Sequence, residues 1–180
     1  MSTTETYSHI QEIITKQFAD KVFNFQETYG MLSFEAPKEL NLEVLGFLTN
    51  HPELGFAFMT DLCAVHFPDK KGAELQVVYH MHNLEKNVRI RFKVSTAIED
   101  PTVASAAILY PTANWMERET YDFFGVIFTG HPNLKRILNV DEMTYFPLRK
   151  EFPLEDQTRI DKDDEMFGRG GNLLTQSLQN

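Results

Sequence analysis

Apolar residues recur at helical spacing in two stretches near the start of the chain. In the first, Ile10, Ile14 and Phe18 lie four residues apart with polar residues between them. This spacing places them on one side of a helix and predicts an amphipathic helix over residues 7–20. The second stretch begins at Pro37, a residue that suits the first turn of a helix because no N–H is needed there. Its predicted buried stripe is Leu40, Val44, Leu45 and Leu48.

The pattern elsewhere in the first hundred residues has the two-residue period of β-strands. Tyr29-Gly30 interrupts short β-rich pieces between residues 22 and 35 and predicts a turn. Three longer strand-like runs follow, over residues 56–67, 73–83 and 88–96. In the last run, apolar residues alternate with cationic ones at every second position. Alternation of this kind is typical of an antiparallel sheet with one face in water.

The pattern changes after residue 124. Before it, a short helix is expected to begin at Pro101 and Thr102, with Val103, Ala106, Ala107 and Leu109 as its apolar residues. We therefore predict an α+β domain over residues 1–124, with a mostly antiparallel sheet and helices on one face. Residues 125–180 have little periodicity and are interrupted by prolines, which predicts a long irregular C-terminal extension.

The energetics of ordering this extension indicate a partner. Ordering about 50 residues costs at least about 1 kcal/mol each in backbone entropy. At about 25 cal/mol per Å², burial of roughly 2,000 Å² of apolar surface would offset that cost. A small domain offers little surface of this kind, whereas obligate interfaces reach this size. We therefore expect residues 125–180 to wrap a partner protein.

Charge and cysteine content exclude several classes of function. The chain has 180 residues and a formal net charge of −9, which disfavours binding to nucleic acid or to an anionic membrane surface. Cys63 is its single cysteine, so the chain cannot form an internal disulfide or supply the thiolates of an iron–sulfur cluster. The N-terminus lacks the pattern of a signal peptide, and no apolar run approaches the length that spans a bilayer. We expect a soluble, cytoplasmic chain.

Two features of the predicted strands invite a catalytic interpretation. His80 and His82 lie two residues apart, so both rings point to one face, and His66 is the nearest further candidate for a metal ligand. Such a pair also occurs by chance on a solvated strand, and we favour that interpretation. Cys63 lies in an apolar run with no basic neighbour to lower its pKa, which indicates an inert thiol.

The most informative segment is NWMERETYDFFG, residues 114–125. Asn114 fits a helix N-cap with Glu117 at the third position of a capping box, and Gly125 suits the C-terminal end. On this helix Trp115, Arg118, Glu119 and Asp122 fall on one face. Two carboxylates three residues apart can form a general acid–base pair, but the neighbouring guanidinium would keep both ionised. We therefore interpret this face as a salt-bridged docking surface without catalytic residues.

Two further motifs follow the predicted helix. TGHPNLKRIL, residues 129–138, combines a Gly-His-Pro turn with two cations and aliphatic residues. FPLRKEFPLED, residues 146–156, repeats Phe-Pro-Leu around a basic pair. Both motifs resemble peptides that lie along another protein's surface, although an ordered loop would also explain them. The residues that we expect at the partner interface are Trp115, Glu117, Arg118, Glu119, Asp122, Gly125, His131, Pro132, Lys135, Arg136, Arg149 and Lys150.

Together these motifs resemble one family. ERETYDFFGVIFTGHPNLKRIL, residues 117–138, is similar to the signature of the C subunit (30 kDa subunit) of respiratory complex I, the proton-pumping NADH–quinone oxidoreductase. FPLRKEFPLED resembles the tail of the same family, whereas residues after 157 have no counterpart that we recognise. Cyanobacterial and plastid relatives, which accept electrons from ferredoxin, share the signature.

The resemblance implies a cofactor-free subunit of the peripheral arm, with FMN and iron–sulfur clusters held by partner subunits. It implies packing against the quinone-site subunit and neighbouring iron–sulfur subunits, at the cytoplasmic side of the cell membrane. Association with the membrane would occur only through the complex, which carries electrons from NADH to quinone. Two alternatives stay open: a free-standing binding module with a partner-wrapping tail, and a metal-dependent hydrolase built on the two histidines.

Overall fold

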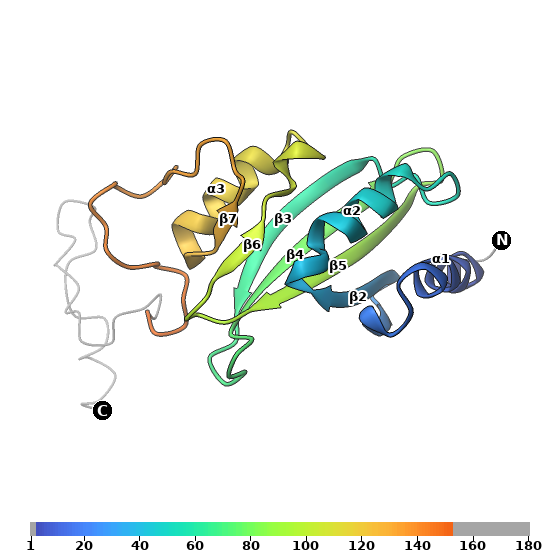
Figure 1. Ribbon diagram of the computed structural model, residues 1–180, viewed down its shortest axis with the longest axis horizontal. Coiled ribbons are helices and arrows are strands. Elements are labelled where there is room, and N and C mark those ends of the chain that lie inside the picture. The colour runs from blue at the N-terminus through green and yellow to red at the C-terminus, as the bar shows by residue number, and fades with distance from the viewer. Residues whose placement is uncertain (1–2, 153–180) are drawn as a thin grey trace, which may run out of the picture. The chain divides into compact units, whose positions relative to one another are not determined.

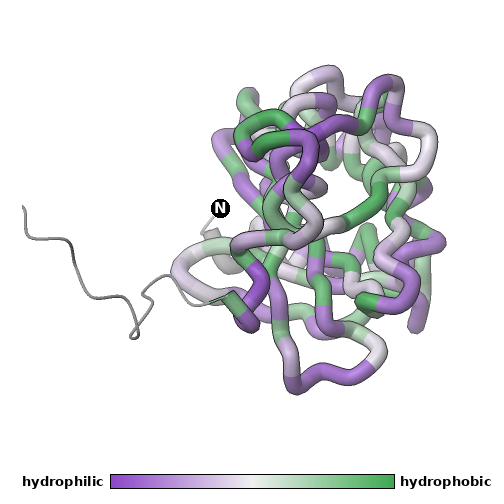
Figure 2. Tube along the Cα trace, turned by 90° about the vertical axis from the view of Figure 1, so that its left-hand side faces the viewer, coloured by the Kyte–Doolittle hydropathy of each residue, from purple (hydrophilic) through white to green (hydrophobic). Residues whose placement is uncertain are grey.

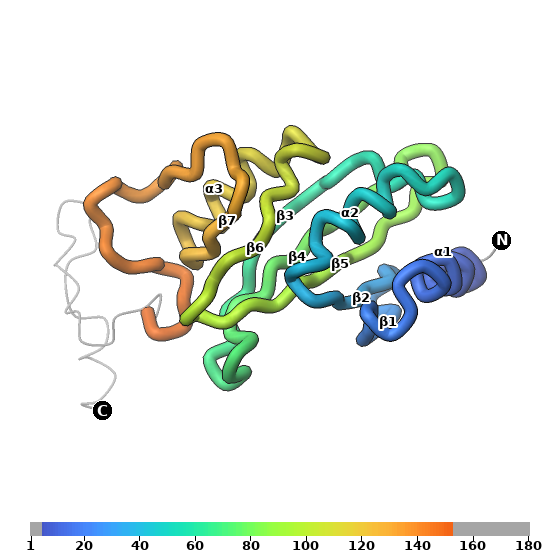
Figure 3. Tube along the Cα trace, viewed as in Figure 1, coloured from blue at the N-terminus to red at the C-terminus, as the bar shows by residue number. Residues whose placement is uncertain are grey.

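A five-stranded sheet forms the centre of the computed structural model, which describes residues 3–152. The strand order is β1-β2-β5-β4-β3 (Figures 1 and 3). Only the β2–β5 pair is parallel, and the other neighbours are antiparallel. The predicted, mostly antiparallel sheet is therefore confirmed. The strands are β1 (Phe23–Thr28), β2 (Met31–Pro37), β3 (Phe58–His66), β4 (Leu75–Asn83) and β5 (Val88–Thr96).

The core lies between one face of this sheet and the helices. Tyr79 and Phe92 on the central strands stack with ring centroids 5.6 Å apart. They share one buried cluster with Ile14 of the first helix and Leu45 of the second. Both predicted apolar stripes are thus confirmed, and the helices cover one face as expected. The α-helices of the described residues are α1 (Thr3–Phe18), α2 (Asn41–Asn50) and α3 (Ala113–Phe124), with short 3₁₀ turns at Ala19–Lys21, Lys38–Leu40 and Ala106–Ile108.

The opposite face of the sheet carries polar side chains in cross-strand pairs. His80 is paired with Arg91 in the sheet register, and the Arg91 Nε donates to the His80 Nε2 at 2.9 Å. Gln76 donates to the Ser95 hydroxyl in the same way. The alternation of β5 predicted this division of inward apolar and outward polar residues.

A second, two-stranded sheet joins β6 (Thr102–Ala104) to β7 (Ile127–Thr129) in parallel. The helix predicted from Pro101 is therefore wrong: the chain forms a strand and then a 3₁₀ turn. Ser105 caps that turn by accepting the Ala107 N–H. The strand forms because its partner lies about 25 residues later in the chain, and local periodicity does not show such a pairing.

The compact unit ends at Lys150 rather than at the boundary predicted after residue 124. After β7 the chain contacts α3 again, from the first turn of the helix at His131 to its C-terminal end at Arg149. The Leu148 N–H donates to the Phe123 carbonyl, and the Lys150 N–H donates to His66 Nδ1. Half of the predicted extension thus packs on its own domain. The last four residues of FPLRKEFPLED and the acidic stretch 159–164 lie outside the described residues.

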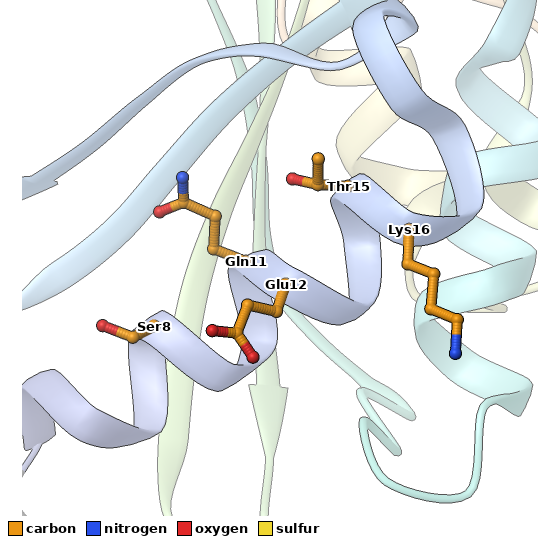
Figure 4. A pocket seen from close by; sticks show the side chains of 5 residues that line it. All are labelled: Ser8, Gln11, Glu12, Thr15 and Lys16. Atoms are coloured by element: carbon orange, nitrogen blue, oxygen red, sulfur yellow. The ribbon is translucent and has the colours of Figure 1, made fainter.

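No helix within residues 3–152 is long and apolar enough to cross a bilayer. Short apolar segments alternate with polar ones along the trace (Figure 2). The outward side of α1 is polar and borders a shallow hollow (Figure 4). Its side chains are Ser8, Gln11, Glu12, Thr15 and Lys16.

Candidate partner interface

Helix α3 carries the motif that the sequence singled out, and it packs against β3, the edge strand of the large sheet. Gly125 ends the helix with φ +79°, and its N–H donates to the Tyr121 carbonyl. The predicted helix stop is confirmed, because this left-handed conformation favours glycine. The predicted N-cap is wrong: the helix begins at Ala113, and Thr112 precedes it without a side-chain cap.

Glu117 is buried inside the domain and does not form a capping box. Its carboxylate accepts the Ser105 hydroxyl at 2.5 Å and the Ala106 N–H at 2.6 Å. It therefore ties α3 to the turn after β6. Burial raises the pKa of Glu117 to about 7, and the two hydrogen bonds oppose that rise only in part. Such a group binds a proton near neutral pH.

The side chain of His131 is also buried, with its Nε2 4.0 Å from the Glu117 carboxylate. Nε2 lies 2.9 Å from the Asn114 carbonyl, and Nδ1 accepts the Asn133 N–H. A neutral ring with hydrogen on Nε2 satisfies both contacts. The Gly-His-Pro turn is thus fastened to the first turn of α3 by its histidine.

Asp122 anchors the segment that follows this turn. Its carboxylate lies 2.7 Å from the Arg136 Nη1 and accepts the backbone N–H groups of Ile137, Leu138 and Asn139. Burial alone would raise the pKa of Asp122, but these donors outweigh it and hold the pKa below its usual range. The sequence interpretation paired this aspartate with Arg118, and that pairing is wrong.

Phe146 fills the space between two guanidinium groups at the end of α3. Arg136 lies 5.2 Å from its ring centroid and Arg149 lies 4.6 Å from it. The Arg149 Nε donates to the Phe124 carbonyl, at the end of the helix. A Cβ on Gly125 would lie 2.5 Å from the Phe146 ring. The glycine therefore permits both the turn and the close approach of this ring.

The remaining motif residues lie at the surface. Arg118 donates to the carbonyls of Lys135 and Arg136 and lies 5.0 Å from the exposed ring of Trp115. The other exposed members of the predicted set are Glu119, Pro132, Lys135 and Lys150. The predicted residues thus divide into a buried group that fixes residues 130–150 to α3 and an exposed group around them.

Large apolar side chains are exposed on α3 and in residues 130–150. Trp115 is 62% exposed, Leu138 is 67% and Val140 is 63%. Further exposed apolar residues between 108 and 150 are Ile108, Ile127, Tyr145 and Leu148. Trp and Arg are the residue types that most often dominate binding energy at protein interfaces, so this surface is suited to a protein partner.

The histidine pair does not assemble a site of three ligands. Within residues 3–152, no three metal-ligating side chains gather. Both ring nitrogens of His80 face protein groups, Arg91 at Nε2 and the Asp61 carboxylate 3.2 Å from Nδ1. Burial first, and then the Arg91 charge, lower the pKa of His80. His66 lies in register with Leu75 on the core face, away from the other two histidines.

Sequence reasoning missed the long-range partners of the buried carboxylates. Ser105 and Arg136 lie 12 and 14 residues from their acidic partners, beyond the reach of a helical wheel. A signal was present in Ser105, which follows a short β-branched run and suits a cap or turn.

Two solved structures share this architecture. A trypsin-resistant fragment of Nqo5 is similar at a TM-score of 0.60 and 26% identity, covering 72% of this chain and 99% of the fragment. A chain of the membrane-bound sulfane sulfur reductase, an archaeal respiratory membrane complex, matches at 0.69 over 87% of this chain and 96% of its own length. At 24% identity, that second likeness shows the fold alone.

The family follows from the sequence comparisons. The model of the 30 kDa subunit of respiratory-chain NADH dehydrogenase matches residues 34–158, and the chain belongs to this family. The C subunit of the NADH-quinone oxidoreductase of Rhizobium rhizogenes is 38% identical over 161 residues, covering 89% of this chain and 80% of that protein. The resemblance carried by residues 117–138 is therefore confirmed.

Proposed function

We propose that the chain is a cofactor-free subunit of the peripheral arm of NADH–quinone oxidoreductase. In this role it scaffolds the quinone-site and iron–sulfur subunits while the complex carries electrons from NADH to quinone. FMN and the iron–sulfur clusters would belong to those partners, since Cys63 is the single cysteine of this chain. The complex would be a proton translocase, and the chain would lie at the cytoplasmic side of the membrane.

The observation that supports this proposal is the arrangement of α3 and residues 130–150. The buried carboxylates of Glu117 and Asp122 are occupied by donors of the same chain, so they hold structure in place. Around them, Trp115 and Leu138 expose apolar surface. A rigid backbone that presents exposed anchors is what a permanent interface requires.

A tagged chain in mildly solubilised membranes tests the proposal. We expect the tag to migrate on a native gel with a very large band that stains for NADH dehydrogenase activity. Arg118→Ala, which removes a cation stacked on the exposed Trp115, should reduce that band while the purified chain keeps its fold. A tag that migrates near its own mass in the soluble fraction would contradict the proposal and favour the free-standing binding module.

A further inference from the structure

A groove of about 320 Å³ runs between the edge strand β3 and the C-terminal half of α3. Its apolar wall comes from Leu62, Phe123, Phe124 and Leu148, and Cys63 also lines it. The groove therefore joins three separate parts of the chain. Leu148 is 40% exposed there, so the groove is continuous with the exposed apolar surface of the proposed interface.

Two carboxylates border this apolar wall. Asp61 lies on β3 with 54% of its side chain exposed, and Glu119 lies on the exposed side of α3. None of the described residues that line the groove is a lysine or an arginine. Two arginines outside the lining are engaged elsewhere: Arg91 donates to His80, and Arg149 donates to the Phe124 carbonyl. The groove therefore combines negative charge with an apolar surface.

The negative field extends to the thiol in the groove. Burial raises the pKa of Cys63 to about 11, and the carboxylate of Asp61 adds to that rise. The charge of Arg91 opposes this rise in part, and Glu119 adds a smaller contribution to it. The thiol thus stays protonated and reacts slowly, but it reports on whether anything lies over the groove.

We propose that this groove receives a segment of a partner subunit in which a lysine or arginine is flanked by apolar side chains. The cation would lie between Asp61 and Glu119, where opposite charges meet outside the deep interior and desolvation is modest. The flanking side chains would cover Phe123 and Leu148. This inference rests on the proposed function, because it names the chemistry of one partner contact within that assembly.

Cys63 permits a direct test, since it is the only thiol of the chain. The purified full chain and the assembled complex are treated with methyl methanethiosulfonate, and modification of the Cys63 peptide is followed by mass spectrometry. We expect the rate of Cys63 modification to be at least about tenfold lower in the complex than in the purified chain. A tenfold decrease corresponds to a free energy of about 1.4 kcal/mol for uncovering the thiol. Equal rates in the two samples would overturn the proposal.

The isolated chain provides the second arm. If Cys63 is already protected in the purified chain and deletion of residues 153–180 exposes it, the occupant is the chain's own C-terminal segment. If protection in the purified chain rises with protein concentration, the occupant is a second copy. Either outcome overturns the assignment to a partner subunit.

Charge reversal tests the role of the two carboxylates. Asp61→Lys and Glu119→Lys should each lower the amount of tagged chain in the NADH-active band by at least about tenfold, because like charges juxtaposed at an interface repel. Glu12→Lys makes the same change of charge on the outward side of α1 (Figure 4) and should assemble normally. Melting of each purified variant shows whether its fold is intact.

The two proposals fail in different ways. If the unmodified chain does not migrate with the NADH-active band, the proposed function is wrong. If it does, and both groove variants assemble as well as Glu12→Lys, only the groove assignment is wrong.

Discussion

The buried carboxyl group of Glu117 makes the stability of the domain depend on pH. Its pKa is about 7 in the folded chain, against an ordinary value of 4.5. Because the folded state binds the proton more tightly, the free energy of unfolding falls as pH rises from about 4.5 to about 7. The difference between the two pKa values corresponds to about 3 kcal/mol in the free energy of unfolding. This contribution is complete below pH 4 and is lost above pH 8. Below pH 4 the group is protonated in both states and contributes no pH dependence.

Glu117→Gln separates this effect from the other titrations. The amide oxygen can still accept the Ala106 N–H, and the amide N–H can donate to the Ser105 oxygen, so both contacts of the carboxylate are retained in kind. Urea unfolding of the purified chain, followed by circular dichroism from pH 5 to 8.5, measures the result. We expect the variant to gain about 2.5 kcal/mol relative to the native chain between these limits.

The control is Glu12→Gln, which makes the same exchange on the exposed side of α1 (Figure 4). It should leave the pH dependence of unfolding unchanged. Parallel curves for the native chain and Glu117→Gln would show that Glu117 is ionised in the fold, and the reasoning from its burial would then be refuted.

Three further substitutions test the attachment of residues 130–150. Asp122→Asn leaves the buried guanidinium of Arg136 without its countercharge and should lower the free energy of unfolding by about 3–5 kcal/mol. Thermal melting measures this loss, and residues 130–150 should be cleaved earlier by protease. Unchanged melting would show that Asp122 does not anchor this segment. Gly125→Ala should cost more than Gly130→Ala, since both have positive φ but only Gly125 approaches another side chain; equal losses in urea unfolding would exclude the clash. Arg118→Ala should lower the free energy of unfolding of the purified chain by no more than about 1 kcal/mol, as expected for a surface contact. A larger loss would show that Arg118 stabilises the domain itself.

Local periodicity was sufficient for most of the large sheet and its helices. The spacing of Ile10, Ile14 and Phe18 placed α1, and the alternation of β5 placed its inward and outward faces, because both signals come from neighbours within a few residues. The parallel pairing of β2 with β5 and of β6 with β7 did not follow. Such pairs join segments that are distant in the chain, and nothing in either segment alone specifies the other.

The helix that carries the candidate interface was predicted correctly, but the connections of its side chains were not. The motif from Asn114 to Gly125 does form a helix, which carries the exposed Trp115 and the half-buried Arg118. The helical wheel treated Asp122 as a surface residue, because the chain that covers it has no periodic pattern of its own. Irregular segments that are held by side-chain-to-backbone hydrogen bonds leave little trace in hydrophobic periodicity.

The parallel contact between β2 and β5 has a consequence for synthesis of the chain. β1 closes one edge of β2 through a local hairpin, which forms in about 1–10 μs. The other edge of β2 is unpaired until β5 has been synthesised, because Leu32 pairs with Ile90. At about 5–20 residues per second, translation of the intervening chain takes roughly 3–12 s. Ribosome-bound chains arrested before residue 88 should therefore leave β2 open to protease, whereas chains that have released residue 96 should protect it.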